Sequence, residues 1–445
     1  MPEISQNAAR ILIKSLSRGV VRPGATKYFH RGHEKWLAAQ LEELTEIEED
    51  GGAVVHFVRG AYGEGKTHFL NHLEALAQER GWVTAHIESR KDMAELDRFE
   101  TIYPKIMQKL RLSADSLESE TDLSDDPARI LLDRWAEKLL KEVGYEKRYI
   151  TKPLEAEMRL FEILQDRVMR RNLPGDLQRV FCAYPRASLI GEVNIQNDLV
   201  AWFRGEERII HVPSYLLSNP GSRVKAPGVD PLMVKPIAIR PIGKSTSNDV
   251  FRGVIWLLTT CGYKGLILSV DEIEMIARLK PSKRMDQALQ TLREFVDNTD
   301  GDVGLQHVAI YFAATPIMFD DESYFRSYDA LATRIEPVSD QVNWRSPVID
   351  LEKTMLTVED LKWVASRIRS IYGRAYGAEA AARFSDEDIK QTVIVVDKSR
   401  YRIAKPRLLC RVVVDQLDKL REGRPSQSLD QTVSQIATLL VKENE

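Results

Sequence analysis

Residues 60–67 read GAYGEGKT, which is a complete G-x-x-x-x-G-K-[ST] phosphate loop. The glycines of such a loop let backbone N–H groups turn inward around phosphate oxygens. Lys66 can reach the β- and γ-phosphates of a nucleotide, and the Thr67 hydroxyl can bind Mg²⁺. The pattern therefore predicts a nucleotide site made by the loop and the residue after it: Gly60, Ala61, Tyr62, Gly63, Glu64, Gly65, Lys66, Thr67 and His68.

The segments on either side of this loop are those that a phosphate loop requires. Residues 53–58 form a short apolar run rich in β-branched residues, which predicts a buried strand. Apolar side chains recur at helical spacing from Phe69 to Ala77, and Gly81 follows as a helix stop. A strand, a glycine turn and a helix N-terminus make the anion site of a nucleotide-binding domain, so a chance match to the pattern is disfavoured.

A second apolar run ends in two carboxylates and supplies what hydrolysis needs beyond phosphate binding. Residues 266–270 predict a central parallel strand, and Asp271 and Glu272 follow it. We expect Asp271 to hold Mg²⁺, directly or through water, and Glu272 to orient and deprotonate the attacking water. The alternative is an ordinary strand that ends in a solvated acidic turn. For the nearby Glu274, a solvated or capping role is favoured.

A third strand is predicted over residues 307–313, and Thr315 lies at its tip. A polar residue in this position can sense the γ-phosphate, although Thr315 can also be a turn former before Pro316. Beyond the strand, Arg334 can project into the nucleotide of a neighbouring subunit as a catalytic finger, which predicts a homo-oligomer. Arg326 is the rival for that role, and either arginine can instead be a surface ion-pair partner.

Arg407 follows Pro406 at a predicted helix start, where proline is well tolerated. An arginine there can reach the γ-phosphate from a helical lid. The alternative is a plain charged first turn.

Composition limits the classes of protein that remain. The 445 residues suffice for two or three domains, and the formal net charge of −3 gives no global basic excess for nucleic acid. Cys182, Cys261 and Cys410 are widely spaced, make no metal pattern and indicate a reducing compartment. No apolar run approaches the roughly 18 residues of a membrane span, and the N-terminus has no signal-peptide core. We therefore expect a cytoplasmic protein that does not enter a membrane.

Patterning divides the chain into four parts. Residues 1–52 predict a helical prelude that could fold over the adenine base, and residues 53–90 and 248–351 carry the strands of the nucleotide core. Residues 91–247 are far more than a crossover requires and predict a mainly helical insertion. Residues 352–445 predict a helical lid, in which Thr357 with Asp360 and Ser385 with Asp388 form capping boxes.

One stretch of the insertion, residues 211–247, is rich in proline and glycine. A single acid, Asp230, faces an excess of basic residues: Arg223, Lys225, Lys235, Arg240 and Lys244. This composition favours binding to DNA or to a protein partner. A long loop with scattered lysines is the alternative.

In their order and amino-acid sequence, these motifs are similar to those of ATP-binding proteins of bacterial BREX-type anti-phage systems, the BrxD-like group. The likeness is carried mainly by residues 59–67, 202–205, 263–266 and 325–328, and by the order of phosphate loop, long insertion, Asp271-Glu272 and the sequence AATP at 313–316. That group is related to AAA+ ATPases of the origin-recognition type. The resemblance implies an α/β fold with an AAA+-type P-loop parallel-sheet core, a large helical insertion and a C-terminal helical lid.

The resemblance also implies Mg²⁺-dependent ATP hydrolysis in a defence system, with work on DNA beside a helicase or methyltransferase partner. A rival class is a nucleotide-gated assembly scaffold with negligible turnover, and Glu272 discriminates because a scaffold needs no base. A kinase is disfavoured, since nothing beside Asp271 resembles a pocket for an acceptor substrate.

Overall fold

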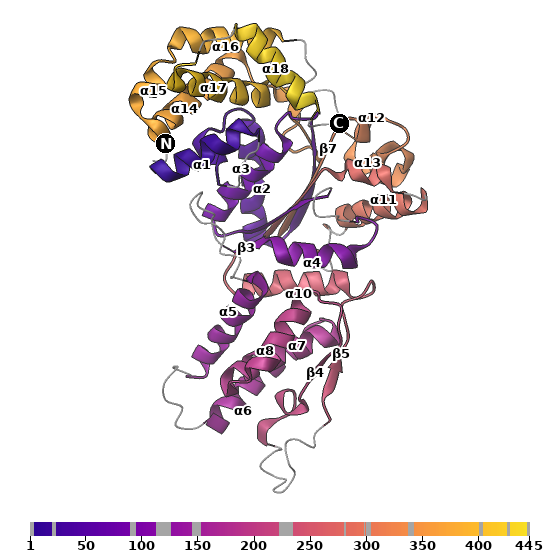
Figure 1. Cartoon of the computed structure of the whole chain (residues 1–445). Coiled ribbons are helices and arrows are strands. Elements are labelled where there is room, and N and C mark those ends of the chain that lie inside the picture. The colour runs from indigo at the N-terminus through magenta and orange to yellow at the C-terminus, as the bar shows by residue number, and fades with distance from the viewer. Residues whose placement is uncertain are drawn as a thin grey trace.

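The computed structural model describes residues 4–19, 24–89, 95–112, 126–144, 153–221, 235–279, 282–297, 299, 304–336, 342–399, 404–424 and 428–442. Its centre is a six-stranded sheet in the order β3-β2-β6-β7-β1-β8 (Figure 1). All neighbouring pairs are parallel except β2 with β3. The strands are β1 (Ala53–Arg59), β2 (Val83–Glu88), β3 (Leu110–Arg111), β6 (Leu266–Asp271), β7 (Val308–Ala314) and β8 (Val348–Asp350).

The register of this sheet decides which residues meet. Arg59 at the end of β1 pairs with Ala314 at the end of β7, and β6 ends at Asp271 on the other side of β7. The carboxyl ends of the three strands therefore share one edge, and the segments that follow them begin there. β6 and β7 are buried at every position, because helices cover both faces of the sheet.

Two hydrophobic clusters lie against the two faces of the sheet. On one face, α2 (Glu34–Asp50) and α3 (Lys66–Glu79) pack on alternate residues of β1, β6 and β7, such as Val58, Ile267 and Tyr311. The opposite face carries α4 (Phe99–Lys109), α10 (Ser247–Thr260) and α11 (Ser282–Asp297). Shorter elements follow the strands: η5 (Ile273–Arg278), α12 (Ile317–Asp320), η6 (Phe325–Ser327), α13 (Asp329–Ile335) and η7 (Leu351–Thr354).

The second cluster continues beyond α10 into a segment that projects away from the sheet (Figure 1). It holds α5 (Pro127–Glu142), α6 (Pro153–Leu164), η2 (Gln165–Met169), α7 (Gly175–Ile190), α8 (Val193–Phe203) and η3 (Ser214–Leu216). A hairpin of β4 (Ile210–Val212) and β5 (Ile237–Ile239) runs along it. Inside, the buried Arg186 pairs with Glu157 at 2.9 Å. Of the basic segment, Arg223, Lys225 and Asp230 lie outside the described residues.

A third cluster joins the C-terminal helices to the first helix of the chain. It contains α14 (Val358–Tyr376), α15 (Ala378–Ala382), α16 (Asp386–Lys398), α17 (Lys405–Glu422) and α18 (Leu429–Lys442), together with α1 (Gln6–Ser17). The two capping boxes predicted at the starts of α14 and α16 are confirmed. The short η1 (Thr26–Tyr28) leads from α1 toward α2. Within the described part of the chain, no helix is long and apolar enough to cross a membrane.

Candidate nucleotide site

The phosphate loop joins β1 to α3 and holds its lysine inside the turn. Gly63 and Gly65 have φ values of 83° and 96°, which only glycine adopts without strain. Lys66 is 8% exposed, and its Nζ donates to the carbonyls of Gly60 at 2.8 Å and Ala61 at 3.2 Å. Among the described residues, no carboxylate lies within ion-pair distance of this ammonium group. A buried cation without a counter-ion is costly, so the loop is suited to an anion such as a nucleotide phosphate.

The end of β6 meets the first turn of α3 directly beside that lysine. The Thr67 hydroxyl donates a short hydrogen bond to Oδ2 of Asp271, which is 2% exposed. The other oxygen, Oδ1, accepts the backbone N–H of Glu272 at 2.8 Å. A hydroxyl and a carboxylate facing each other next to a phosphate site are the protein ligands that Mg²⁺ uses in such sites, the rest being phosphate oxygens and water. The described residues include no group of three or more His, Cys, Asp or Glu side chains that could hold a metal ion by themselves.

Glu272 and Thr315 lie at the same edge, after neighbouring strands. Glu272 has a φ of 57°, one of three non-glycine residues in the left-handed region among those described. This conformation is uncommon for a glutamate, and it makes the sharp turn from β6 into η5. Thr315 follows β7, and the carbonyl of the preceding Ala314 accepts the N–H of Gly60 at 3.4 Å. The fold thus brings Gly60, Asp271 and Thr315 to one edge, although their roles are not fixed by that placement.

Glu274 is a member of this group that the sequence interpretation set aside as solvated. It lies on η5, and its Oε2 is buried without a hydrogen-bond partner among the described residues. Burial raises the pKa of this carboxyl, while Lys66 and the backbone N–H of Thr315 act in the opposite direction. The charge of Asp271 also acts on Glu274, in the same direction as burial, so the two carboxyl groups are neighbours at this edge.

The residue before the loop, Arg59, ties it to the neighbouring elements and was also not predicted. Its guanidinium pairs with Asp320 of α12 at 2.7 Å, with Asp350 of β8 at 3.3 Å and with Glu352 of η7 at 3.8 Å. Burial and the nearby Glu352 raise the pKa of Glu64 in the loop, and Lys66 and Lys405 oppose them. The loop therefore lies within a network of charged side chains from segments far from it in the sequence.

Arg407 approaches the loop from the first turn of α17. A Cβ added to Gly63 would lie 3.0 Å from the Ala404 side chain and 3.9 Å from Cδ of Arg407. One added to Gly19, just after α1, would lie 3.2 Å from Nε of Arg407. The arginine is thus packed between the phosphate loop and the end of α1, on a helix that belongs to the C-terminal cluster.

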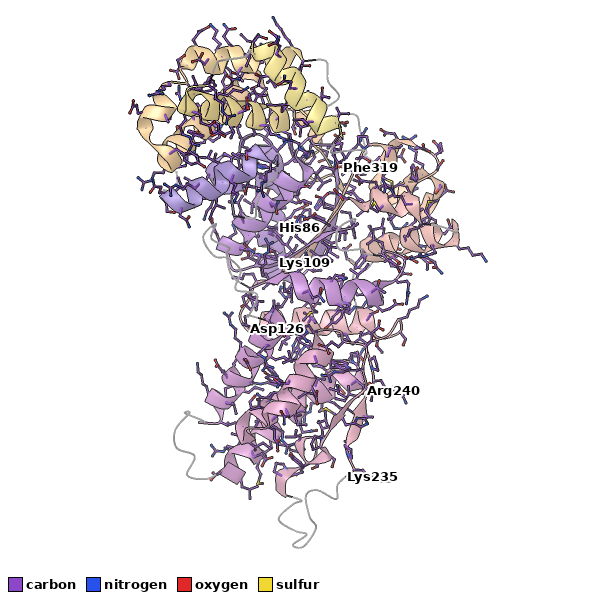
Figure 2. All side chains as sticks on the ribbon, viewed as in Figure 1. His86, Lys109, Asp126, Lys235, Arg240 and Phe319 are labelled. Atoms are coloured by element: carbon purple, nitrogen blue, oxygen red, sulfur yellow. The ribbon has the colours of Figure 1, made fainter. Side chains whose placement is uncertain are left out.

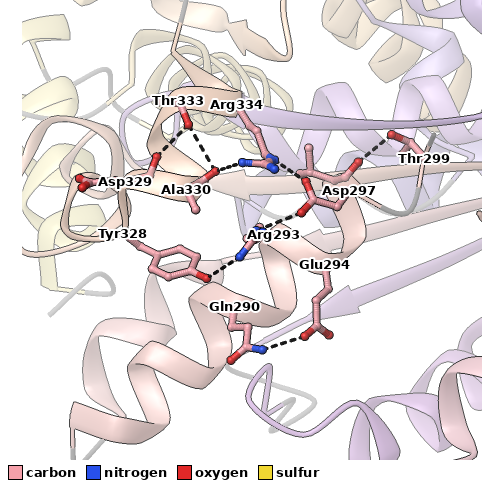
Figure 3. Close-up of polar contacts among 11 residues, drawn as sticks. Gln290, Arg293, Glu294, Asp297, Thr299, Tyr328, Asp329, Ala330, Thr333 and Arg334 are labelled. Atoms are coloured by element: carbon pink, nitrogen blue, oxygen red, sulfur yellow. Dashed lines mark hydrogen bonds and ion pairs between the residues drawn. The ribbon is translucent and has the colours of Figure 1, made fainter.

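Arg334 lies apart from this edge, on the surface of α13 (Figure 3). Its Nε donates a short hydrogen bond to Asp297 at the end of α11, and its Nη1 donates to the carbonyl of Ala330 at 2.5 Å. Asp297 also pairs with Arg293 at 3.0 Å, which in turn donates to the Tyr328 hydroxyl at 3.2 Å. The described contacts hold Arg334 within this exposed cluster and do not bring it to the loop of its own chain.

Arg326, the rival for the finger role, is likewise on the surface. It bonds to the carbonyl of Phe319 at 2.9 Å and to Glu322 at 3.3 Å.

His68, predicted to line the site, has its side chain in a stack of histidines beneath it. His68 Nε2 lies 3.0 Å from Nδ1 of His30, whose ring stacks on that of His72 at 3.9 Å between centroids. Burial, and then the neighbouring histidines, lowers the pKa of His68 to about 3, and burial lowers that of His72 to about 4. Any contact of His68 with a nucleotide would therefore come from its backbone. The stack joins the segment before α2 to the phosphate-loop helix.

These features define an α/β protein with a phosphate loop at the carboxyl edge of a largely parallel sheet. A scan against protein-family models matches residues 4–212 and 236–435 to the family described as BREX system ATP-binding protein BrxC/D. The chain belongs to this family, and the resemblance noted in the sequence is confirmed. Membership supports ATP binding and a role in a BREX defence system. A search of curated proteins finds no match.

Proposed function

We propose that the protein hydrolyses ATP in a Mg²⁺-dependent reaction, as an ATPase of the AAA+ type. The observation that carries the proposal is the contact between the Thr67 hydroxyl and the buried Asp271 carboxylate, next to the buried Lys66, whose ammonium has no carboxylate within ion-pair distance among the described residues. Phosphate binding alone needs the loop and its lysine. A carboxylate aimed at the loop hydroxyl from the adjacent strand is the added element that an ATPase uses.

Each residue has a separate task in this proposal. The backbone of residues 60–68 and the Lys66 ammonium bind the phosphates, and Thr67 and Asp271 would hold Mg²⁺. The ion would neutralise charge on the transferring phosphoryl group. Glu272 accepts a proton from the attacking water, and Thr315 orients the γ-phosphate. Glu274, with its buried oxygen beside Lys66, acts as a positioning residue for Thr315 and for that water.

The remaining roles require movement or a second subunit. Arg334 completes the site of a neighbouring copy in a homo-oligomer, because its contacts in the described structure keep it on the surface. Arg407 senses the γ-phosphate from α17, so that the C-terminal helices act as a lid.

Phosphate release measured on wild type, Lys66→Ala and Glu272→Gln tests this proposal. Lys66→Ala should lose ATP binding, and Glu272→Gln should bind ATP and lose turnover, because the amide keeps the shape of the side chain and cannot act as a base. Turnover by Glu272→Gln equal to wild type would contradict the catalytic assignment. ATP binding without turnover by wild type in any assembled state would instead establish the rival function, a nucleotide-gated scaffold.

BREX membership implies other BREX proteins as partners. We further propose that residues 211–247 contact DNA or a DNA-bound partner. Figure 2 places Lys235 and Arg240 on the hairpin segment that projects from the sheet. Lys235, Arg240 and Lys244 are exposed, and none has an ion pair with a carboxylate among the residues described. Replacing these three by Gln should flatten the salt dependence of DNA binding and spare ATP hydrolysis.

A further inference from the structure

The outward side of α1 carries cations and no acids. Arg10, Lys14 and Arg18 follow one another at intervals of four residues, so they lie along one side of the helix, and all three are exposed. Residues 4–19 contain no Asp or Glu. Within the described structure, none of the three cations forms an ion pair with a carboxylate. Most other exposed arginines of the described chain have such a partner, as Arg170 has Asp166 at 2.6 Å.

The helix that carries these cations is held firmly in place. Its inner side buries Ala9, Leu12 and Leu16 against α14 and α17. Two arginine bonds add to this packing: Arg10 Nε donates to the carbonyl of Ala375 at 3.1 Å, and Arg374 Nε donates to that of Ile4 at 3.2 Å. The positive side is therefore a fixed feature of a packed helix.

Beside the cations the surface is hollowed. The hollow has a volume of about 290 Å³, and its lining consists of the apolar Ile11 and Ile13 and of six polar or aromatic residues: Arg10, Lys14, Ser17, Tyr376, Asp418 and Arg421. Its one acid, Asp418, already accepts the hydroxyl of Tyr372 at 2.6 Å. The Tyr376 ring is covered on one side by Tyr372, at 4.8 Å between centroids, and Arg421 lies 4.3 Å from its centroid. Arg10 and Lys14 thus border a hollow in which Asp418 bonds to Tyr372 and Arg421 pairs with the neighbouring Glu422 at 3.8 Å.

We propose that this α1 cation surface, formed by Arg10, Lys14 and Arg18, binds the phosphate backbone of duplex DNA. Cations four residues apart on a helix are spaced by about 6 Å, and each strand of duplex DNA carries a phosphate every ~3.4 Å of the axis, so phosphates of one strand can reach all of them. Single-stranded sites use open aromatic rings on which bases stack, and the ring of Tyr376 is not open. Contacts of this kind position DNA without reading its sequence. The inference goes beyond the proposed ATPase and does not depend on it.

Fluorescence anisotropy of a labelled duplex, titrated with the full-length protein between about 50 and 200 mM salt, tests this surface. The variant R10Q/K14Q/R18Q should lower the log–log slope by about 0.9 for each lost phosphate contact, or ~2.7 in all. Its affinity should then change about 40-fold less than that of wild type over this range. Because R10Q also loses the bond to Ala375, the charge reversal K14E gives a second variant that leaves this bond intact.

The matched control is K362Q/R383Q/K390Q, which removes three cations of the C-terminal helices. Each of these cations already pairs with a glutamate: Lys362 at 2.7 Å, Arg383 at 3.3 Å and Lys390 at 3.6 Å. It should keep the slope of wild type. Equal slopes for this control, K14E and the α1 variant would overturn the proposal, as would wild type that binds no duplex at low salt. Displacement of the duplex by polyglutamate as readily as by unlabelled duplex would also overturn it, in favour of an acidic protein. If K235Q/R240Q/K244Q alone abolished the salt dependence, DNA would belong to residues 211–247 and the α1 proposal would fail.

Discussion

Lys66 and Arg334 are both assigned to the phosphates of ATP, and they differ in burial, in partners and in distance from the loop. Lys66 is 8% exposed and is held by two loop carbonyls of its own chain. The Arg334 side chain is 36% exposed and is held by Asp297, which it shares with Arg293. In the proposed site, one chain therefore supplies the phosphate-binding residues, and Arg334 remains on its surface.

The difference indicates which functions survive in a single subunit. The phosphate-binding contacts lie within one chain, because the central sheet alone brings residues 60–67 and the end of β6 together. An exposed ion pair such as Arg334–Asp297 contributes only about 0–1 kcal/mol, so a phosphate of a neighbouring subunit can replace Asp297 as the partner. On this view ATP binds to one chain, and rapid hydrolysis needs two.

The largest effect is expected where the buried cation is removed. Lys66→Ala should lower ATP affinity by at least ~10³-fold, because the loop then has no side-chain cation to offset the phosphate charge. Calorimetric titration with ATP measures the change, and Lys35→Ala, an exposed lysine on α2, is the control. ATP binding by Lys66→Ala within about tenfold of wild type would contradict the assignment of Lys66 to the site.

The surface arginine should affect turnover and not binding. Arg334→Ala should keep ATP affinity and lose about 10³-fold in kcat, as for an arginine finger supplied in trans. Arg326→Ala serves as the matched variant, since that arginine is the rival and is also exposed. Mixing Arg334→Ala with Glu272→Gln should restore part of the activity, because an intact finger can then reach an intact site. Absence of rescue in mixtures that co-assemble on a sizing column would count against a finger in trans.

Glu274 provides a further test within the phosphate-binding part of the proposed site. Glu274→Gln should lower kcat by about 10- to 100-fold and leave KM close to wild type, as expected for a residue that positions the reacting groups. Glu294→Gln is the control, because Glu294 lies on the exposed side of α11 and accepts a hydrogen bond from Gln290 at 3.0 Å. Equal kcat in the two variants would return Glu274 to a structural role.

Arg407 tests whether the C-terminal helices take part in nucleotide recognition. Arg407→Ala should reduce the preference for ATP over ADP by about tenfold, the loss of one charge-assisted hydrogen bond, with ADP affinity nearly unchanged. Lys390→Ala on α16 is a control from the same cluster. If calorimetry shows that ATP and ADP are weakened equally, Arg407 only packs against the loop.

The histidine stack predicts a smaller and pH-dependent effect. The folded protein lowers the pKa of His72 from 6.5 to about 4, so the unfolded chain takes up the proton first as the pH falls below 6.5. Stability is therefore lost between about pH 6.5 and 4, and at pH 5 this one group should account for about 2 kcal/mol. The unfolding free energy of His72→Gln, whose side chain can still bond to Thr26, should therefore fall by about 2 kcal/mol less than that of wild type between pH 7 and pH 5. Denaturant titrations at pH 7 and pH 5 measure this change. If the unfolding free energy fell by the same amount in wild type and His72→Gln, the lowered pKa of His72 would be contradicted.

The sequence allowed the contiguous parts of this site to be predicted. Residues 60–67, Asp271 and Glu272 were found because a glycine turn and an acidic strand end are local patterns, and the structure brings Thr67 to Asp271. The capping boxes of α14 and α16 were predicted for the same reason.

What was missed depends on contacts between distant parts of the chain. The stack of His30 on His68 and the pair of Asp297 with Arg334 join residues 38 and 37 positions apart, which no local pattern records. α7 was not predicted because it is buried on nearly all sides from Val180 to Ala187 and contains Pro185, so it has no amphipathic period. The hairpin of β4 and β5 escaped prediction because its strands are three residues long.

The central claim is that Thr67 and Asp271 complete a Mg²⁺–ATP site around Lys66. Calorimetric binding of ATP to wild type and to Asp271→Asn, each in Mg²⁺ and in EDTA, tests it most directly. Wild type should bind ATP at least tenfold more tightly in Mg²⁺ than in EDTA, and Asp271→Asn should lose that difference while keeping the affinity seen in EDTA. An equal gain from Mg²⁺ in both proteins would show that the ion is held without Asp271 and would contradict the account.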